Sequence, residues 1–243
     1  MLGFSKKMTL QKLYSYTRQA INDFQMIQDG DKIAIGVSGG KDSLALLYAL
    51  SGLQKFISEK IDIVAITVDL GFGNFETEEI RKLCEKLGIE YHLVKTQIAD
   101  ILKAKIKEGS FCSLCAKMRK GALNNFAKGL GCNKIAYAHH KDDFVETMIL
   151  SLFYEGQFFS FPPVKYYEDV DLTVIRPLLY VSEKDIIGFQ NKMTLQSIKN
   201  PCPFDKNTKR EYVKNLLRQL KKDNPEIQQK MFNAILKGKI YEW

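Results

Sequence analysis

Two kinds of segment alternate along the chain up to residue 153. Short apolar runs, typical of buried strands, occupy residues 32–37, 61–68, 90–95 and 134–138. The segments predicted to be helical are 9–28, 44–50, 76–87, 115–130 and 143–153. Strands that alternate with helices predict a parallel sheet that is covered by helices on both faces. Sheets of this kind bind ligands at the carboxyl ends of their strands.

The pattern loosens after Pro162-Pro163. Residues 164–167 and 172–175 are predicted to pair as a hairpin, and further helices are predicted at 183–191, 208–222 and 226–236. We therefore expect one α/β domain with helical additions at both ends. The expected parts are an N-terminal helical extension at 1–30, the α/β domain at 31–180 and a C-terminal helical part at 181–243.

The loop after the first strand carries the strongest chemical signal. It reads Ser-Gly-Gly-Lys-Asp-Ser between a strand and a helix, an arrangement that collects backbone N–H groups around one anion. Two glycines let the backbone approach a phosphate closely. The ordinary P-loop has Ser or Thr after Gly-Lys, whereas Asp42 stands here, which suggests a held magnesium ion or a loop that grips pyrophosphate. The candidate phosphate-binding residues are Ser38, Gly39, Gly40, Lys41, Asp42 and Ser43.

Polar residues follow two other predicted strands. The second strand ends in Asp69, and the fourth is followed by His139-His140, Asp142 and Asp143. Because the carboxyl ends of parallel strands meet in one crevice, we expect these residues to converge with the phosphate loop. The two later aspartates open a helix, where they would either cap it or hold a metal ion. His140 suits either strand-end packing or a polar contact in an active site.

Five cysteines in a chain that begins without a secretory signal argue against a disulfide framework. Cys112 and Cys115 form a C-x-x-C at the start of a helix, where the helix dipole lowers the pKa of a thiol. Cys202 lies between two prolines, in a segment expected to be extended. Three such thiols suit a 4Fe–4S cluster with one open iron, a redox-active pair, or part of a zinc site. Cys84 and Cys132 are expected to be structural.

The charge of the chain favours a polyanionic partner. A net charge of +8 and a pI near 9.1 are typical of proteins that bind nucleic acid. No apolar stretch approaches the ~20 residues of a membrane span, so we expect a soluble, cytoplasmic protein. Basic residues beside the C-x-x-C, Lys117 and Lys120, and those of a C-terminal helix would meet RNA phosphates. The helical set is Lys209, Arg210, Lys214, Arg218, Lys221 and Lys222.

Five motifs occur together in the order found in one known family. They are AINDFQMIQDGDKIAIGVSGGKDS (20–43), CSLCAKMRKG (112–121), AHHKDDFVET (138–147), LFYEG (152–156) and IRPLLYVSEKDI (175–186). SGGKDS resembles the signature of the PP-loop ATP pyrophosphatases. The whole set resembles the tRNA 2-thiocytidine synthetases, which are iron–sulfur members of that group. The resemblance implies a Rossmann-like sheet of the adenine nucleotide alpha hydrolase type, usually assembled as a homodimer.

The same resemblance implies ATP- and Mg²⁺-dependent formation of 2-thiocytidine at position 32 of tRNA. ATP would bind on the 38–43 loop with its adenosine near Val68 and Asp69, and a 4Fe–4S cluster would be held by Cys112, Cys115 and Cys202. The base carbonyl attacks the α-phosphorus, and a sulfur on the open iron then displaces AMP. The sulfur would come from a cysteine desulfurase or from free sulfide. The expected catalytic residues are Lys41, Asp42, Arg119, Asp142 and Asp143, with His140 at the nucleotide.

One departure from the family leaves the target base open. Many members carry a second C-x-x-C at the third ligand, whereas Pro203-Phe204-Asp205 follows Cys202 here. A tRNA thiouridine synthetase therefore stays an alternative. A tRNA lysidine synthetase shares SGGxDS but has no use for the three cysteines. A non-catalytic, zinc-stabilised RNA-binding module is disfavoured by the intact loop. Arg119, one turn after Cys115, would face the cluster ligands or belong to a solvated helix face.

Overall fold

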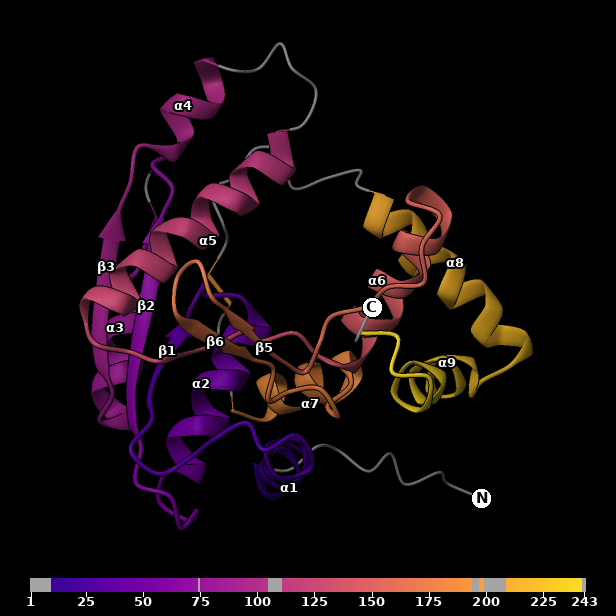
Figure 1. Ribbon diagram of the computed structural model, residues 1–243, viewed down its shortest axis with the longest axis horizontal. Helices are drawn as coiled ribbons and strands as arrows, with labels where there is room; N and C mark the ends of the chain where they lie inside the picture. Colours follow the sequence, from indigo (N-terminus) through magenta and orange to yellow (C-terminus); the bar gives the residue numbers. More distant parts are fainter. Residues whose placement is uncertain (1–9, 74, 105–110, 194–196, 199–208, 242–243) are drawn as a thin grey trace.

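The computed structural model describes residues 10–73, 75–104, 111–193, 197–198 and 209–241. Within these ranges six strands form one sheet in the order β3-β2-β1-β4-β6-β5 (Figure 1). The first five of these strands run parallel, and β5 pairs antiparallel with β6 at the edge. The strands are β1 (Lys32–Gly36), β2 (Asp62–Asp69), β3 (Glu90–Lys95), β4 (Lys134–Ala136), β5 (Val164–Tyr167) and β6 (Leu172–Ile175). The predicted hairpin thus extends the sheet.

Helices cover both faces of the sheet, because side chains along each central strand alternate between two cores. Ile33 and Ile35 of β1 belong to the core that includes α2 (Lys41–Leu53) and α3 (Glu78–Leu87). Ala34 faces the opposite core, which is built with α5 (Phe111–Gly129). Strand residues that are buried on both faces explain the continuous apolar runs from which the strands were predicted.

The remaining helices surround this sandwich. They are α1 (Leu10–Asp23), α4 (Ile98–Ala104), α6 (Lys141–Tyr154), α7 (Glu183–Met193), α8 (Lys209–Asp223) and α9 (Ile227–Lys237). α8 and α9 pack on α6 and on each other, far from the β3 edge (Figure 1). None of the helices in the described ranges is long and apolar enough to cross a membrane.

Three helix boundaries differ from the predicted ones. The described part of α5 begins at Phe111, four residues before the predicted start, so both Cys112 and Cys115 lie on the helix. α6 begins at Lys141, so its two aspartates occupy the second and third helical positions. α1 ends at Asp23 because Gln25 adopts a left-handed conformation with φ of 47°.

The order of the strands reverses between β1 and β4. The chain builds outward from β1 through β2 to β3, and then returns to place β4 on the other side of β1. The loops that leave β1 and β4 therefore diverge and open a crevice at the carboxyl edge. The 38–43 loop and residues 137–140 border this crevice.

A buried ion pair closes the opposite, amino end of the same two strands. Lys134 Nζ lies 2.7 Å from Asp31 Oδ2, and both side chains are less than a tenth exposed. Lys134 also donates to the Met26 carbonyl, and Asp31 accepts from the Gln28 N–H and the Asn133 amide. Every charged oxygen and nitrogen of the pair therefore has partners, which a buried pair needs.

We expect the substitution Lys134→Met to lower the free energy of unfolding by about 3–5 kcal/mol, because it leaves the Asp31 carboxylate buried without a counter-charge. Urea unfolding followed by circular dichroism measures the change. Lys128→Met is the matched control, because Lys128 pairs with Asp171 at an exposed site and its loss should matter far less. Equal losses in the two variants would contradict the assigned role.

Candidate active site

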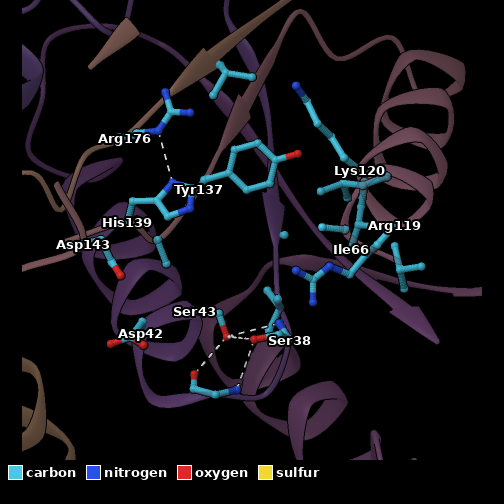
Figure 2. A pocket seen from close by; sticks show the side chains of 18 of the residues that line it. Ser38, Asp42, Ser43, Ile66, Arg119, Lys120, Tyr137, His139, Asp143 and Arg176 are labelled. Atoms are coloured by element: carbon cyan, nitrogen blue, oxygen red, sulfur yellow. Dashed lines mark hydrogen bonds between the residues drawn. The ribbon is translucent and has the colours of Figure 1, made fainter. Parts of the chain in front are cut away.

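A pocket of about 690 Å³ lies at the carboxyl edge of the sheet (Figure 2). Residues that follow β1, β2, β4 and β6 line it, and the N-terminal half of α5 contributes Ala116, Arg119 and Lys120. Its volume is that of an ordinary small-molecule or cofactor site. The convergence of separate strand ends on one crevice is as predicted from the sequence.

The 38–43 loop forms the floor of this pocket and is held in one shape by its serines. The Ser38 N–H donates to Ser43 Oγ at 3.2 Å, and Ser43 Oγ donates to the Gly40 carbonyl at 2.9 Å. Gly39 has φ of 79°, and a Cβ on it would lie 3.0 Å from the Cβ of Ile198. Only glycine fits there without strain. The first N–H groups of α2 have no intrahelical acceptor and face the same point.

Lys41 and Asp42 take different directions from this loop. Asp42 lines the pocket, whereas Lys41 is not among the lining residues. Lys41 Nζ lies 2.9 Å from Asp42 Oδ2 and 3.0 Å from Glu183 Oε1 at the start of α7. Burial lowers the pKa of Lys41, but the carboxylates of Asp42 and Glu183 outweigh it, and the pKa is raised. The lysine therefore joins α2 to α7 in this arrangement.

The two aspartates of α6 also differ. Asp142 Oδ2 accepts from the Glu183 N–H at 2.7 Å, so it caps the first turn of α7. Asp143 lines the pocket, and its Oδ2 accepts from the His140 N–H at 2.9 Å. The His140 ring is only 2% exposed and lies among the carboxylates, with Nε2 3.4 Å from Asp143 and 3.6 Å from Asp42.

No group of three or more His, Cys, Asp or Glu side chains in the described ranges is arranged to hold a metal ion. Asp42 and Asp143 nevertheless line the same pocket, and Figure 2 shows them on the same side of it. Carboxylate oxygens are the kind of ligand that Mg²⁺ prefers in proteins.

The buried Glu146 side chain of α6 pairs with two basic residues of α8. Glu146 is 2% exposed, and its two oxygens lie 3.3 Å from Arg210 and 3.8 Å from Lys214. Arg210 also reaches Asp143 at 3.0 Å, and Lys214 reaches Glu183 at 3.4 Å. These two cations, which were predicted to belong to an RNA surface, thus point toward α6 and α7.

The wall at β4 and β6 is aromatic and buried. The His139 ring stacks on Phe161 at 4.3 Å, and its Nδ1 accepts from Arg176 Nε at 3.1 Å. Burial, and then the positive charge of Arg176, lower the pKa of His139 to about 3. Burial raises the pKa of Tyr137 to about 12. Both side chains therefore stay neutral at pH 7.

The C-x-x-C directly precedes a residue of α5 that lines the pocket. Cys112 is exposed and Cys115 is partly buried, and Ala116, the next residue, already lines the pocket. Cys202 falls outside the described residues. The chain before it is tied to the phosphate loop, because the Ile198 N–H donates to the Gly39 carbonyl at 3.0 Å.

The predicted site residues that line the pocket are Ser38, Gly40, Asp42, Ser43, Val68, Asp69, Arg119 and Asp143. Gly39 and His140 do not line it, and Lys41 and Asp142 contact Glu183 of α7. His139, which was expected to converge with the phosphate loop, lines the pocket as well, whereas the prediction missed Tyr137, Phe161, Lys165 and Arg176. Position at a strand end was an available signal for Arg176, which directly follows β6.

The fold and the site together define a member of the PP-loop family. Residues 10–222 match the family model of the PP-loop domain. A tRNA-cytidine(32) 2-sulfurtransferase from Geobacter sulfurreducens is 37% identical over 96% of this chain and 92% of the relative. One from Alcanivorax borkumensis is 39% identical over 93% of this chain and 80% of the relative. Within the PP-loop group, the chain belongs to the tRNA-cytidine(32) 2-sulfurtransferase family.

Solved structures agree with the fold. The U34-tRNA thiolase NcsA from Methanococcus maripaludis, with its [4Fe-4S] cluster, superimposes with a TM-score of 0.77 at 24% identity, covering 94% of this chain and 78% of that chain. The NH3-dependent NAD synthetase from Campylobacter jejuni gives a TM-score of 0.52 at 19% identity, covering 96% and 93%. The predicted Rossmann-like α/β fold is confirmed.

Glu146 gives the site a pH-dependent stability. Burial, only partly offset by Lys214 and Arg210, raises the pKa of Glu146 from 4.5 to about 7. The folded protein therefore keeps this proton at pH values where the unfolded chain has lost it. The contribution is fully present below about pH 4.5 and is lost as the pH rises through about 7, at up to about 1.4 kcal/mol per pH unit.

We expect Glu146→Gln to remove this dependence, so that the variant gains stability relative to the wild type between about pH 5 and pH 7. Urea unfolding at a series of pH values measures it. Glu155→Gln, at an exposed position after the same helix, controls for the loss of a glutamate. Parallel pH profiles for the wild type and E146Q would refute the assignment.

Proposed function

We propose that the protein is an ATP-dependent tRNA sulfurtransferase that replaces the O2 carbonyl oxygen of cytidine 32 with sulfur. One observation carries this proposal: the SGGKDS loop forms the floor of the pocket, and α5, which carries the C-x-x-C, contributes Ala116, Arg119 and Lys120 to its lining. The phosphate loop and the helix that carries the thiols thus border one cavity. The 37% identity to a curated enzyme of this activity supports it.

In this proposal the loop and the N-terminus of α2 hold the phosphates of ATP. The adenosine lies at the end of β2, against Val68 and Asp69, which line the pocket beside the loop. Arg119 has no carboxylate partner in the described part of the chain and lies exposed at the same pocket, as Figure 2 shows. Its guanidinium neutralises charge that develops on the α-phosphate.

Asp42 and Asp143 are the proposed Mg²⁺ ligands, together with phosphate oxygens and water. Lys41 acts indirectly, because its ammonium pairs with Asp42 and fixes where that carboxylate points. Asp142 holds α7 in place rather than meeting the metal. His140 Nε2 lies within 3.6 Å of both the Asp42 and the Asp143 carboxylates, so His140 contacts both proposed ligands.

The proposed reaction has two steps. The base oxygen attacks the α-phosphorus and pyrophosphate leaves with its electron pair. A sulfide nucleophile then attacks the base carbon, and the C–O bond breaks as AMP departs with the oxygen. The pocket residues place the base and phosphate in line and exclude water, which would otherwise hydrolyse the adenylated base.

The cysteines fit a 4Fe–4S cluster because cysteine sulfur atoms are the usual ligands of such clusters. The two thiols of the C-x-x-C lie about one turn apart on α5, and Cys112 is exposed. Cys202 is the proposed third ligand. When bound, a cluster with three protein ligands leaves one iron open to bind a sulfide ligand.

The sulfur donor, the oligomeric state, the cellular location, the domain division and the tRNA contacts remain predictions made from the sequence. The sulfur is proposed to come from a cysteine desulfurase or from free sulfide, and the protein is proposed to act as a homodimer in the cytoplasm. The division into 1–30, 31–180 and 181–243 is likewise a proposal. Lys117 and Lys120, on the helix that borders the pocket, are proposed to meet the tRNA backbone near the chemistry.

We expect anaerobically purified protein to form AMP and pyrophosphate with unmodified tRNA, and to yield 2-thiocytidine. A bound 4Fe–4S cluster would colour the protein brown. Cys112→Ala should abolish this colour and lower thiolation at least 100-fold while ATP still binds, because only a cluster ligand is lost. Nucleoside mass spectrometry and cluster absorbance measure this.

Cys84→Ala is the matched control, since Cys84 is buried in α3 away from the pocket and should not affect either readout. Formation of ADP would contradict the PP-loop chemistry. A thiolated uridine instead of 2-thiocytidine would contradict the assigned base.

A further inference from the structure

The β4–β6 end of the pocket carries polar groups that the proposed ATP site does not use. Phosphates occupy the loop after β1, and the adenosine lies on the β2 side. The opposite wall consists of Tyr137, His139, Phe161 and Arg176. The rings of Tyr137 and His139 are neighbours, with centroids 5.8 Å apart. The pocket therefore has a second half, with its own chemistry.

The Tyr137 hydroxyl is buried and has no hydrogen-bond partner in the part of the chain that the structure describes. Leaving such a group unsatisfied costs about 1–3 kcal/mol, so it calls for a ligand. Figure 2 shows the hydroxyl pointing across the pocket toward α5. Since its pKa is about 12, the phenol keeps its proton and can both donate and accept.

His139 is locked as a hydrogen-bond donor. Arg176 Nε–H can only donate, so His139 Nδ1 must accept, and the ring proton lies on Nε2. Because the pKa of His139 is about 3, the ring does not gain a second proton at pH 7. Arg176 is itself held by the Pro162 carbonyl and by the Phe161 face, 5.0 Å from its guanidinium carbon. His139 therefore cannot move its ring proton from Nε2 to Nδ1 to suit a different ligand.

We propose that this wall is the subsite that holds the target pyrimidine and selects cytosine over uracil. His139 Nε2–H donates to N3 of the base, the Tyr137 hydroxyl meets the exocyclic group at C4, and O2 is left facing the α-phosphate. Arg176 is a positioning residue that sets the tautomer. This inference rests on the proposed function and adds its base specificity.

The selectivity follows from the chemistry of one ring position. N3 of cytosine is an acceptor, whereas N3 of uracil carries a proton. A histidine that can only donate forms a hydrogen bond to N3 of cytosine. With uracil, the N–H of the histidine and the N3–H of the base would face each other in a buried site, which is unfavourable. The tyrosine does not discriminate, because its hydroxyl can accept from the cytosine amino group or donate to the uracil carbonyl.

The test compares the holoenzyme and its variants on two tRNAs that differ only in having C or U at the target position. Thiolation kcat/KM and ATP affinity are both measured. The wild type should prefer C by about ten-fold or more, which corresponds to about 1.4 kcal/mol. His139→Gln, whose amide can donate or accept, should bring this preference close to one while ATP affinity is unchanged.

Tyr137→Phe should raise KM for the C-containing tRNA several-fold with the preference retained. The control is Tyr166→Phe, since Tyr166 is exposed on β5, bonds to Asp171 and does not line the pocket. His139→Asn provides a second variant should H139Q not fold.

An unchanged C-to-U preference in both His139 variants, with ATP affinity intact, overturns the inference alone. A loss of ATP affinity in H139Q or Y137F also overturns it, because the wall would then hold the nucleotide. If the wild type forms no thiolated cytidine on either tRNA, the proposed function itself fails.

Discussion

The reversal of strand order between β1 and β4 is the constraint on which the rest of the structure depends. Both strands are central and buried, so their continuations must leave the sheet at its carboxyl edge and in opposite directions. This divergence creates a cavity without any side chain having to hold it open. A glycine-rich turn on one side and an aromatic wall on the other then determine what the cavity binds. The proposed phosphate site and the proposed base subsite are thus explained by one topological feature.

The C-terminal helices complete the site by ionic contacts rather than by extending the sheet. Asp143 and Glu146 on α6 receive Arg210 of α8, and Ile198 bonds to the phosphate loop at Gly39. The residues that flank the segment of Cys202 are therefore tied to two walls of the same pocket.

The sequence predicted those features of the site that depend on local pattern. The strands, the turn at Gly39-Gly40 and the aspartates after strands two and four follow from periodicity and from the strand-end rule. The direction of each side chain did not follow. Asp142 and Asp143 are adjacent in sequence, yet one caps α7 and the other lines the pocket. That difference depends on where α7 packs, which no local pattern encodes.

Stability and chemistry lie at opposite ends of the same strands. At the amino end, Lys134 and Asp31 are buried with every polar atom satisfied, so their desolvation is compensated. At the carboxyl end, the Tyr137 hydroxyl has no such compensation within the described residues, and His139 is kept neutral by burial. A site that must recognise an uncharged base has to offer such unsatisfied groups before the base arrives. The well-packed amino end, with Asp31 and Lys134 tied into the chain on both sides, is what lets the fold tolerate that cost.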